Sequence, residues 1–370
     1  MSFKHLEMSS NYKSVNNLKV SEDLLSFVDN ELLKDTEISP EKFWLGLSET
    51  LHDLAPKNKE LIKKRQILQK KIDEWHVKNK GKDIKLEEYK KFLQEIGYLI
   101  DEGPDFKIET DNVDDEITKI AGPQLVVPIM NARYTLNAAN ARWVSLYDSL
   151  YGTNIIESDE GGSERYDPLR GQEVIKYVRE FFDKYIPIEG TSWKNIAALK
   201  VINKDLVILK DDYEYKLKDK NKFVGHRGDA NKPSAIIIQN NNLHFEIIIN
   251  PKAFSAAHDI AGISDVIAES AVSTICDNED SVAAVDANDK IVCYKNWLGL
   301  MKGSLKIQFE KNGKNLERKL NPDRSYISKE GKGLKLHGRS LLLIRNVGHL
   351  MTNPSIILKD GSEVPEGIMD

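Results

Sequence analysis

The sequence predicts an α/β fold in which short buried strands alternate with helices. Three continuous apolar runs have the length of a buried strand: residues 125–130, 272–276 and 341–344. Polar or charged residues follow each run at once, which is where parallel α/β folds build their sites. Helical patterns and paired shorter strands separate the runs, so we expect segments of parallel sheet with two β-rich insertions.

The first hundred residues are rich in Lys and Glu and predict two amphipathic helices. In the first helix, one stripe recurs at spacings of three and four: Leu61, Arg65, Leu68, Ile72 and Trp75. Gly81 is expected to end it. The second helix carries a similar stripe: Leu86, Tyr89, Leu93 and Ile96. We interpret the pair as surface helices packed on a larger body rather than as a separate binding module.

The pattern changes at Ile120. The Gly122-Pro123 turn precedes the strand at residues 125–130, which Pro128 is expected to end or bend. A helix of small residues is expected from Ala138 to Trp143.

Residues 151–249 predict a mixed α+β block. A helix is expected near 173–185, followed by strands 206–209 and 213–217, then 235–238 and 243–249. The Asn-rich connection at 240–242 is typical of a tight hairpin, because Asn tolerates a positive φ.

After Pro251 we expect a helix at residues 263–271, the strand at 272–276, and a further helix that starts within 282–287. A second β-rich stretch covers 305–336 and leads into the strand at 341–344.

Composition limits the classes of function. A chain of 370 residues is expected to form two or more domains. The net charge of −5, from 53 basic and 58 acidic residues, indicates neither nucleic acid nor a membrane as a partner. No apolar run reaches the roughly 20 residues of a membrane span. Only two cysteines are present, which favours the cytoplasm.

Three polar segments are the candidate sites: residues 131–134, 277–281 and 345–349. Arg133 is also compatible with an ordinary surface position, and Glu279 with Asp280 could cap a helix instead. His349 is more typical of a structural histidine. Arg345 follows four aliphatic residues, so we expect it near the interior and facing an anion.

The sequence contains no GxxxxGK[ST] loop, no GxGxxG after a strand and no Cys/His cluster of the metal-binding type. Nucleotide hydrolysis and dinucleotide redox chemistry are therefore disfavoured.

The same three regions resemble the malate synthase G family. The resemblance lies in GPQLVVPIMNARYTLNAANARWVSLYDSLYGT (122–153), NEDSVAAVDANDKIVCYKNWLGLMKG (278–303) and GRSLLLIRNVGHLMTNP (338–354). It extends over residues 122–370 and more weakly through the N-terminal helices. It implies an α/β fold, a (β/α)8 TIM barrel of which only the first strands are present, with an N-terminal helical clasp and an inserted α/β domain.

By this resemblance the chain divides into six segments. They are a helical clasp (1–105), a first barrel segment (106–141), the inserted α/β domain (142–271), a barrel segment (272–303), a second part of the β-rich insertion (304–338) and a further barrel segment (339–370).

The resemblance also implies an activity of the glyoxylate cycle: condensation of acetyl-CoA with glyoxylate, then hydrolysis to malate and CoA. It makes Arg345, in RNVGHLMT, the catalytic arginine that contacts glyoxylate and the enolate oxygen. It assigns acetyl-CoA binding to Val126, Arg133, Tyr134, Ser281 and Arg318. Glu279 and Asp280 match acidic residues near the family's Mg²⁺ site that act through water.

The chain departs from the family because it ends before the regions that carry the Mg²⁺ ligands and the catalytic aspartate. We therefore expect an N-terminal fragment that is inactive alone and prone to aggregate through unpaired strand edges. A separately encoded C-terminal half would then be its partner. The intact enzyme is expected to be a cytoplasmic monomer. The alternative is a non-catalytic remnant that binds CoA or another protein.

Overall fold

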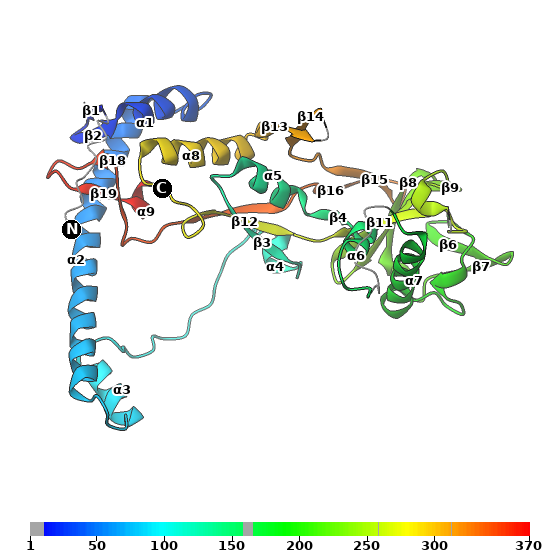
Figure 1. Cartoon of the computed structure of the whole chain (residues 1–370), viewed down its shortest axis with the longest axis horizontal. Helices are drawn as coiled ribbons and strands as arrows, with labels where there is room; N and C mark the ends of the chain where they lie inside the picture. Colours follow the sequence, from blue (N-terminus) through cyan, green and yellow to red (C-terminus); the bar gives the residue numbers. More distant parts are fainter. Residues whose placement is uncertain (1–10, 158–165, 258, 312) are drawn as a thin grey trace. The chain divides into compact units, whose positions relative to one another are not determined.

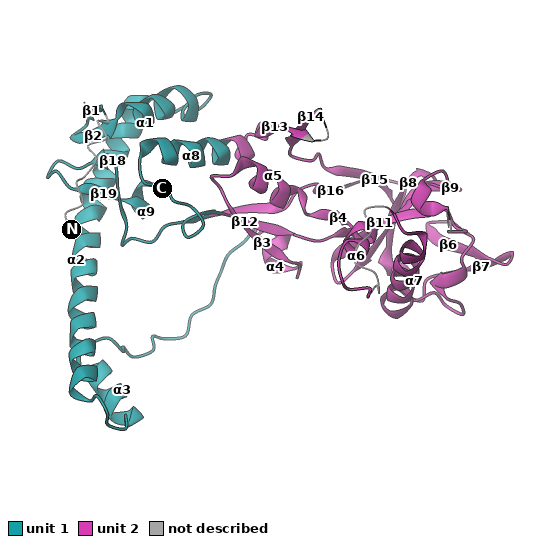
Figure 2. Ribbon diagram, in the orientation of Figure 1, with its two compact units in different colours: residues 1–111, 277–298, 345–370 teal, residues 112–276, 299–344 magenta. Residues whose placement is uncertain are grey.

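The computed structural model describes residues 11–157, 166–257, 259–311 and 313–370 (Figure 1). The chain divides into two compact units, coloured separately in Figure 2. Unit 1 comprises residues 1–111, 277–298 and 345–370, and unit 2 comprises 112–276 and 299–344. Each unit has its own hydrophobic core.

Unit 1 combines a small sheet with a long helix. Its elements are β1 (Tyr12–Val15), β2 (Leu18–Ser21), α1 (Glu22–Phe27), the π-helix η1 (Val28–Leu32), α2 (Pro40–Lys78), α3 (Leu86–Glu95), the first part of α8 (Ala287–Met301), β18 (Thr352–Ile357), β19 (Glu363–Pro365) and α9 (Glu366–Met369). The four strands pair in the order β1-β2-β18-β19. Their core includes residues far apart in sequence: Val20, Leu51, Ala287, Ile356 and Val364.

Helix α2 starts where the local sequence provides a cap. The Ser39 side chain accepts a hydrogen bond from the Lys42 amide, and Pro40 occupies the first turn, where its missing N–H costs nothing. The first part of the helix buries Trp44 and Leu51 in the unit 1 core. This part precedes the predicted stripe, so the helix begins some way before the sequence pattern indicated.

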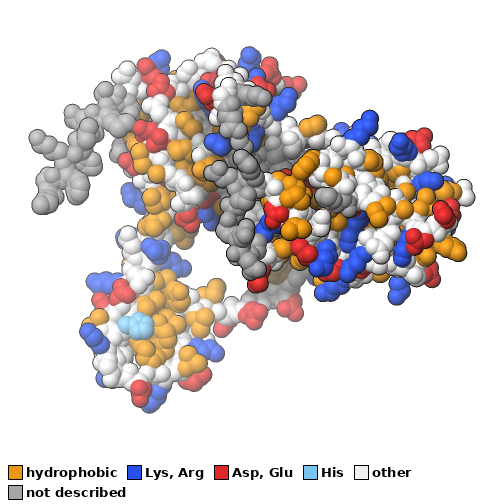
Figure 3. All heavy atoms as spheres, turned by 45° about the vertical axis from the view of Figure 1, so that its right-hand side comes forward, with side chains coloured by type: hydrophobic (Ala, Val, Ile, Leu, Met, Phe, Trp, Pro, Cys, Tyr) orange, Lys and Arg blue, Asp and Glu red, His pale blue; other side chains and the backbone are white. Residues whose placement is uncertain are grey.

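The end of α2 contacts α3 through aromatic side chains, whereas the two helices were predicted to pack on a larger body. The Trp75 ring lies 4.5 Å from the Tyr89 ring and 5.7 Å from the Phe92 ring. Helix α3 nevertheless buries no residue, and Leu86 is 73% exposed. Hydrophobic side chains gather on the surface of this helical pair (Figure 3).

Unit 2 is predominantly β-structure. Its elements are α4 (Asp115–Thr118), β3 (Gln124–Pro128), α5 (Ala132–Asn140), β4 (Trp143–Ser145), α6 (Leu146–Tyr151), α7 (Pro168–Tyr185), η2 (Trp193–Asn195), β5 (Ala198–Ile202), β6 (Asp205–Lys210), β7 (Tyr213–Tyr215), η3 (Lys220–Lys222), β8 (Phe223–Asp229), β9 (Lys232–Asn240), β10 (Leu243–Ile249), η4 (Phe254–Ala256), β11 (Ile263–Glu269), β13 (Lys306–Lys311), β14 (Lys314–Lys319), β15 (Arg324–Ser328) and β16 (Gly333–Leu336). Strands β12 (Ser273–Asn278) and β17 (Leu341–Asn346) begin in unit 2 and end in unit 1.

The core of unit 2 lies between helix α7 and its sheets. A seven-stranded sheet has the order β16-β15-β8-β9-β10-β11-β4, and a three-stranded sheet has the order β5-β6-β7. Phe182 of α7, Trp193 and Ile236 are fully buried there. The predicted β9–β10 hairpin is confirmed: Asn241 and Asn242 have φ of 50° and 63°, which fits a tight hairpin turn.

Two predicted helices have different bounds or a different structure. Residues 263–271 were predicted as a helix, but residues 263–269 form strand β11, which pairs with β10 and β4. The helix of small residues spans α5, because Asn131 caps it through the Tyr134 amide, and it ends before Trp143. The last helix starts at Ala287, within the predicted range of 282–287, and Asp286 accepts a hydrogen bond from the Asp289 amide at its start.

A second three-stranded sheet, in the order β17-β12-β3, is the parallel part of the fold. The beginnings of its strands are bonded to one another: the Val272 amide donates to Pro123 O (3.0 Å) and the Leu341 amide to Val272 O (2.9 Å). Matched beginnings are the arrangement of parallel neighbours. At Gly122 a Cβ would lie 2.7 Å from Val272 Cγ1, so only glycine allows this close approach. The α/β prediction is supported, and the (β/α)8 barrel stays a prediction.

Among the described residues, no helix is both long enough and apolar enough to cross a membrane. Cys276 and Cys293 are buried free thiols.

Candidate functional site

The centre of the candidate site in unit 1 is an ion pair between Arg345 of β17 and Asp277 of β12. Arg345 Nε donates to Asp277 Oδ1 and Nη2 donates to Oδ2, both at 2.8 Å. Each residue is the fifth of its strand, and the two strands are neighbours in the sheet. The parallel register therefore fixes the planar guanidinium against the planar carboxylate.

Asp277 is held from its other side by the turn that follows β12. Its carboxylate accepts the Ser281 hydroxyl at 2.6 Å and the amides of Glu279 and Ser281 at 3.0 Å each. Its side chain is only 1% exposed. The hydrogen bonds from Arg345, then those from Ser281 and Glu279, outweigh burial and hold the pKa of Asp277 well below its usual range.

Two further carboxylates surround Arg345. Glu279 Oε2 lies 3.3 Å from Nε, and Asp280 Oδ2 lies 3.7 Å from Nη2. The hydrogen bond to Asp277, with the charges of all three carboxylates, raises the pKa of Arg345 further above its usual value. The helix-capping alternative for Glu279 and Asp280 is wrong, because residues 279–286 form a loop.

The expectation for Arg345 was half right. It does face an anion, but its side chain is 41% exposed and does not lie in the interior. Among the described residues no acceptor is bound to Nη1, since the contacts of the side chain engage Nε and Nη2. The guanidinium is therefore held on one edge while Nη1 keeps two N–H donors for a ligand.

A cavity of about 420 Å³ lies beside this turn. Its lining includes Asn278, Glu279, Val347 and Glu366. Asn278 Oδ1 is buried there without a hydrogen-bond partner in the described chain, while Asn278 Nδ2 donates to Asp370. The oxygen could accept a hydrogen bond from a bound ligand or water.

The acidic residues beside Arg345 are not placed to bind a magnesium ion. The described residues hold no group of three or more His, Cys, Asp or Glu side chains placed to bind a metal. Asp280 is 79% exposed, and Asp277 has both oxygens occupied by other donors. These residues do not amount to a metal site, although the excess of negative charge would suit a nearby cation.

The candidate acetyl-CoA residues lie partly in unit 2. Arg133 of α5 and Arg318 of β14 both lie over the ring of Phe309, each with Cζ 5.2 Å from the ring centroid. Val126 and Tyr134 are 57% and 54% exposed. The structure thus brings Arg133 and Arg318 together.

Ser281 has a different environment. It lies in unit 1, and both its hydroxyl and its amide donate to Asp277. This contact makes Ser281 a support of the Asp277 carboxylate in the structure.

Sequence reasoning did not identify the contacts of Asp277 and Phe309. Asp277 was within a segment that stood out, but nothing in the pattern paired it with Arg345. The available signal was its position directly after the apolar run at 272–276. Phe309 carried no signal beyond a place in a β-rich stretch.

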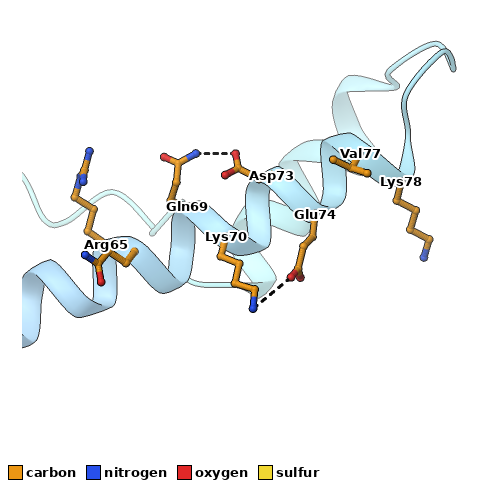
Figure 4. Close-up of a pocket in the computed structure, with 8 residues that line it drawn as sticks. Arg65, Gln69, Lys70, Asp73, Glu74, Val77 and Lys78 are labelled. Atoms are coloured by element: carbon orange, nitrogen blue, oxygen red, sulfur yellow. Dashed lines mark hydrogen bonds and ion pairs between the residues drawn. The ribbon is translucent and has the colours of Figure 1, made fainter. Parts of the chain in front are cut away.

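A shallow hollow on α2 does not form a comparable site. It is lined by residues of that helix alone, between Arg65 and Lys78 (Figure 4). Gln69 donates to Asp73, and Lys70 lies 3.9 Å from Glu74, so neighbours one turn apart satisfy one another. This is an ordinary solvated helix face.

Comparison with known proteins supports the resemblance found in the sequence. A family model described as "Malate synthase G, alpha-beta insertion domain" matches residues 166–240, and one described as "Malate synthase, N-terminal domain" matches residues 23–83.

Curated relatives match almost the whole chain. The protein is 48% identical to malate synthase G of Halalkalibacterium halodurans over 97% of this chain and 50% of the relative. It is 47% identical to that of Corynebacterium efficiens and 48% identical to that of Corynebacterium glutamicum, covering 96% and 95% of this chain and 48% of each relative. The chain spans about half the length of these relatives. By sequence, the chain is similar to malate synthase G along almost its whole length.

Proposed function

We propose that the protein takes part in the malate synthase reaction and that Arg345 stabilises the negative charge that develops on oxygen. In this reaction the acetyl-CoA methyl group loses a proton, and the resulting enolate forms a carbon–carbon bond with the glyoxylate aldehyde carbon. Water then cleaves the thioester, giving malate and CoA. Charge accumulates first on the enolate oxygen and then on the former aldehyde oxygen.

The observation that carries the proposal is the fixed guanidinium of Arg345. Asp277 holds Nε and Nη2 in a bidentate pair, while Nη1 has no described acceptor. A donor that is already oriented needs no reorganisation as charge appears, which is the main source of electrostatic catalysis. Glyoxylate is itself an anion, and a planar fork suits its carboxylate.

Asp277 does not suit the role of the base. Its lowered pKa makes it a weak proton acceptor, and hydrogen-bond donors engage both of its oxygens. We therefore assign Asp277 to orienting Arg345 and assign no described residue as the base. The family implies a metal ion, which we propose to be Mg²⁺.

The remaining parts of the proposal follow the family. Val126, Arg133, Tyr134 and Arg318 are proposed to bind acetyl-CoA, with Ser281 supporting the site through Asp277. The barrel, the six-segment division and the monomeric state are proposed for the intact protein. Its two buried free thiols suit the cytoplasm, which we propose as its location.

The test is Arg345→Lys in the intact protein. Lysine keeps the charge but loses the planar fork, so kcat should fall roughly 100- to 1000-fold. The readout is glyoxylate-dependent release of CoA. Arg339→Lys is the matched control, because that arginine pairs with Asp323 only at 3.7 Å and is 38% exposed. Near-normal turnover in the Arg345 variant would show that another residue stabilises the charge. CoA binding without any turnover in the wild-type protein would favour the non-catalytic alternative.

A further inference from the structure

We propose that Phe309 is a positioning residue that holds Arg133 and Arg318 together as a phosphate-binding pair for the nucleotide part of acetyl-CoA. This inference rests on the proposed function and adds to it a residue that the sequence resemblance does not mark.

The contact joins three elements of unit 2. Arg133 comes from α5, Phe309 from β13 and Arg318 from β14. Both guanidinium carbons lie 5.2 Å from the centroid of one ring, which is within cation–π range. The two guanidinium carbons are therefore no farther apart than twice this distance, even though like charges repel each other.

The register of the β13–β14 hairpin explains how Phe309 meets Arg318. Phe309 is paired with Leu316, and Ile307 is paired with Arg318. Positions 316 and 318 are two apart, so Arg318 lies on the same face as Leu316 and diagonally across from Phe309. Aromatic and long side chains reach each other across that diagonal.

Helix α5 brings the second arginine to the same ring. Arg318 Nη1 donates to Asn137 Oδ1, Asn140 Nδ2 donates to Lys319 O at 2.9 Å, and the Asn321 amide donates to Asn140 Oδ1 at 2.8 Å. These bonds tie the end of β14 to α5. Arg133 lies one turn before Asn137 on that helix. The packing of α5 against the hairpin therefore also places Arg133 beside Phe309.

The charges of this pair are not neutralised. In the described residues, neither Arg133 nor Arg318 has a carboxylate within 4 Å, whereas Arg345 has three. A planar guanidinium can stack on the face of an aromatic ring and still keep N–H donors available for a ligand. Two such cations held by one ring suit a ligand with several phosphate groups, and CoA carries a pyrophosphate and a 3′-phosphate.

The experiment compares CoA with pantetheine, which lacks the phosphates, by calorimetry on the intact protein. Phe309→Leu should weaken CoA binding about 5- to 30-fold, the effect expected for two cation–π contacts at a partly exposed site. Phe309→Tyr should restore binding to within about twofold, since a tyrosine ring offers the same face. Pantetheine binding should not change. In turnover assays KM for acetyl-CoA should rise while kcat stays constant.

Phe254→Leu is the matched control, because Phe254 is also in unit 2, is 73% exposed and has no arginine over its ring among the described contacts. A second experiment makes Phe309→Leu in an Arg318→Gln background. There the substitution should weaken CoA binding clearly less, because one of the two cation–π contacts is already absent. Equal losses in both backgrounds would mean that Phe309 only stabilises the hairpin, and would overturn the inference.

Unchanged CoA binding in Phe309→Leu, with binding intact in the wild type, would overturn the inference and leave the proposed function standing. A wild-type protein that binds no CoA would overturn both.

Discussion

The two arginine sites of this protein are built in opposite ways. In unit 1, Arg345 is held by a bidentate pair with Asp277 and has Glu279 and Asp280 nearby. In unit 2, Arg133 and Arg318 are held over the ring of Phe309, with no carboxylate described beside them. The first site has an excess of negative charge, and the second has an excess of positive charge.

The difference matches the two tasks proposed for them. A carboxylate fixes a guanidinium with high precision but compensates its charge, which suits a donor that must be placed accurately against a reacting oxygen. An aromatic ring orients the guanidinium more loosely and leaves its charge available, which suits binding of a polyanionic ligand. Precision is expected to matter for turnover, and free charge for affinity.

The largest effect is expected from removing the carboxylate. Asp277→Ala leaves the Ser281 hydroxyl and two amides of the turn without an acceptor, so the free energy of unfolding should fall by about 2–4 kcal/mol. Urea denaturation of the intact protein measures it. Asp53→Ala, which removes only an exposed pair with Lys57, should cost less than about 0.5 kcal/mol. Equal costs would show that the hydrogen bonds from the turn to Asp277 do not stabilise the fold.

The next effect concerns affinity for CoA. Arg133→Gln and Arg318→Gln should each weaken binding roughly tenfold, because each loses a charge-assisted hydrogen bond to phosphate. Arg345→Gln should change it less than about threefold, because its guanidinium is compensated. Calorimetry at fixed salt measures all three. A loss in the Arg345 variant as large as in the other two would contradict the division of tasks.

The pH dependence separates the two sites further. The pKa of Asp277 is depressed in the folded protein, so its contribution is fully present above the unfolded value of about 3.9 and is lost as the pH falls through the lower folded pKa. The stability difference between wild type and Asp277→Asn should be constant above pH ~5 and shrink by at most about 1.4 kcal/mol per pH unit below pH ~4.

In the same pH series, the difference in stability between wild type and Phe309→Leu should not change with pH, because no carboxylate among the described residues supports that cluster. A loss of the Asp277 contribution already near pH 6 would show that its pKa is not depressed.

The smallest effect is expected for Arg318→Ala in the absence of ligand. Cation–π contacts at exposed sites are worth about 0.5–1 kcal/mol, so the free energy of unfolding should fall by no more than that. Urea denaturation checks it. A loss of several kcal/mol would mean that the arginine is a structural support of the hairpin, and the contrast with Asp277 would disappear.

Sequence reasoning predicted the strands at 125–130, 272–276 and 341–344 because each continuous apolar run has the length of a strand and is shorter than a typical helix. It predicted the β9–β10 hairpin because Asn tolerates the positive φ that the turn requires. It failed at residues 263–271, where β11 pairs with strands on both sides, since a short apolar segment fits a helix or a strand and its neighbours decide.

By itself, the sequence determined the resemblance to malate synthase G, the α/β class and the position of Arg345 directly behind an apolar run. Only the tertiary structure decided what each arginine faces. Arg345 meets Asp277 because their strands are neighbours in register, and Arg133 meets Phe309 because α5 docks on a hairpin far along the chain. Local pattern fixes a residue's place on its own element, but contacts between distant segments depend on pairing and docking, which no short stretch of sequence encodes.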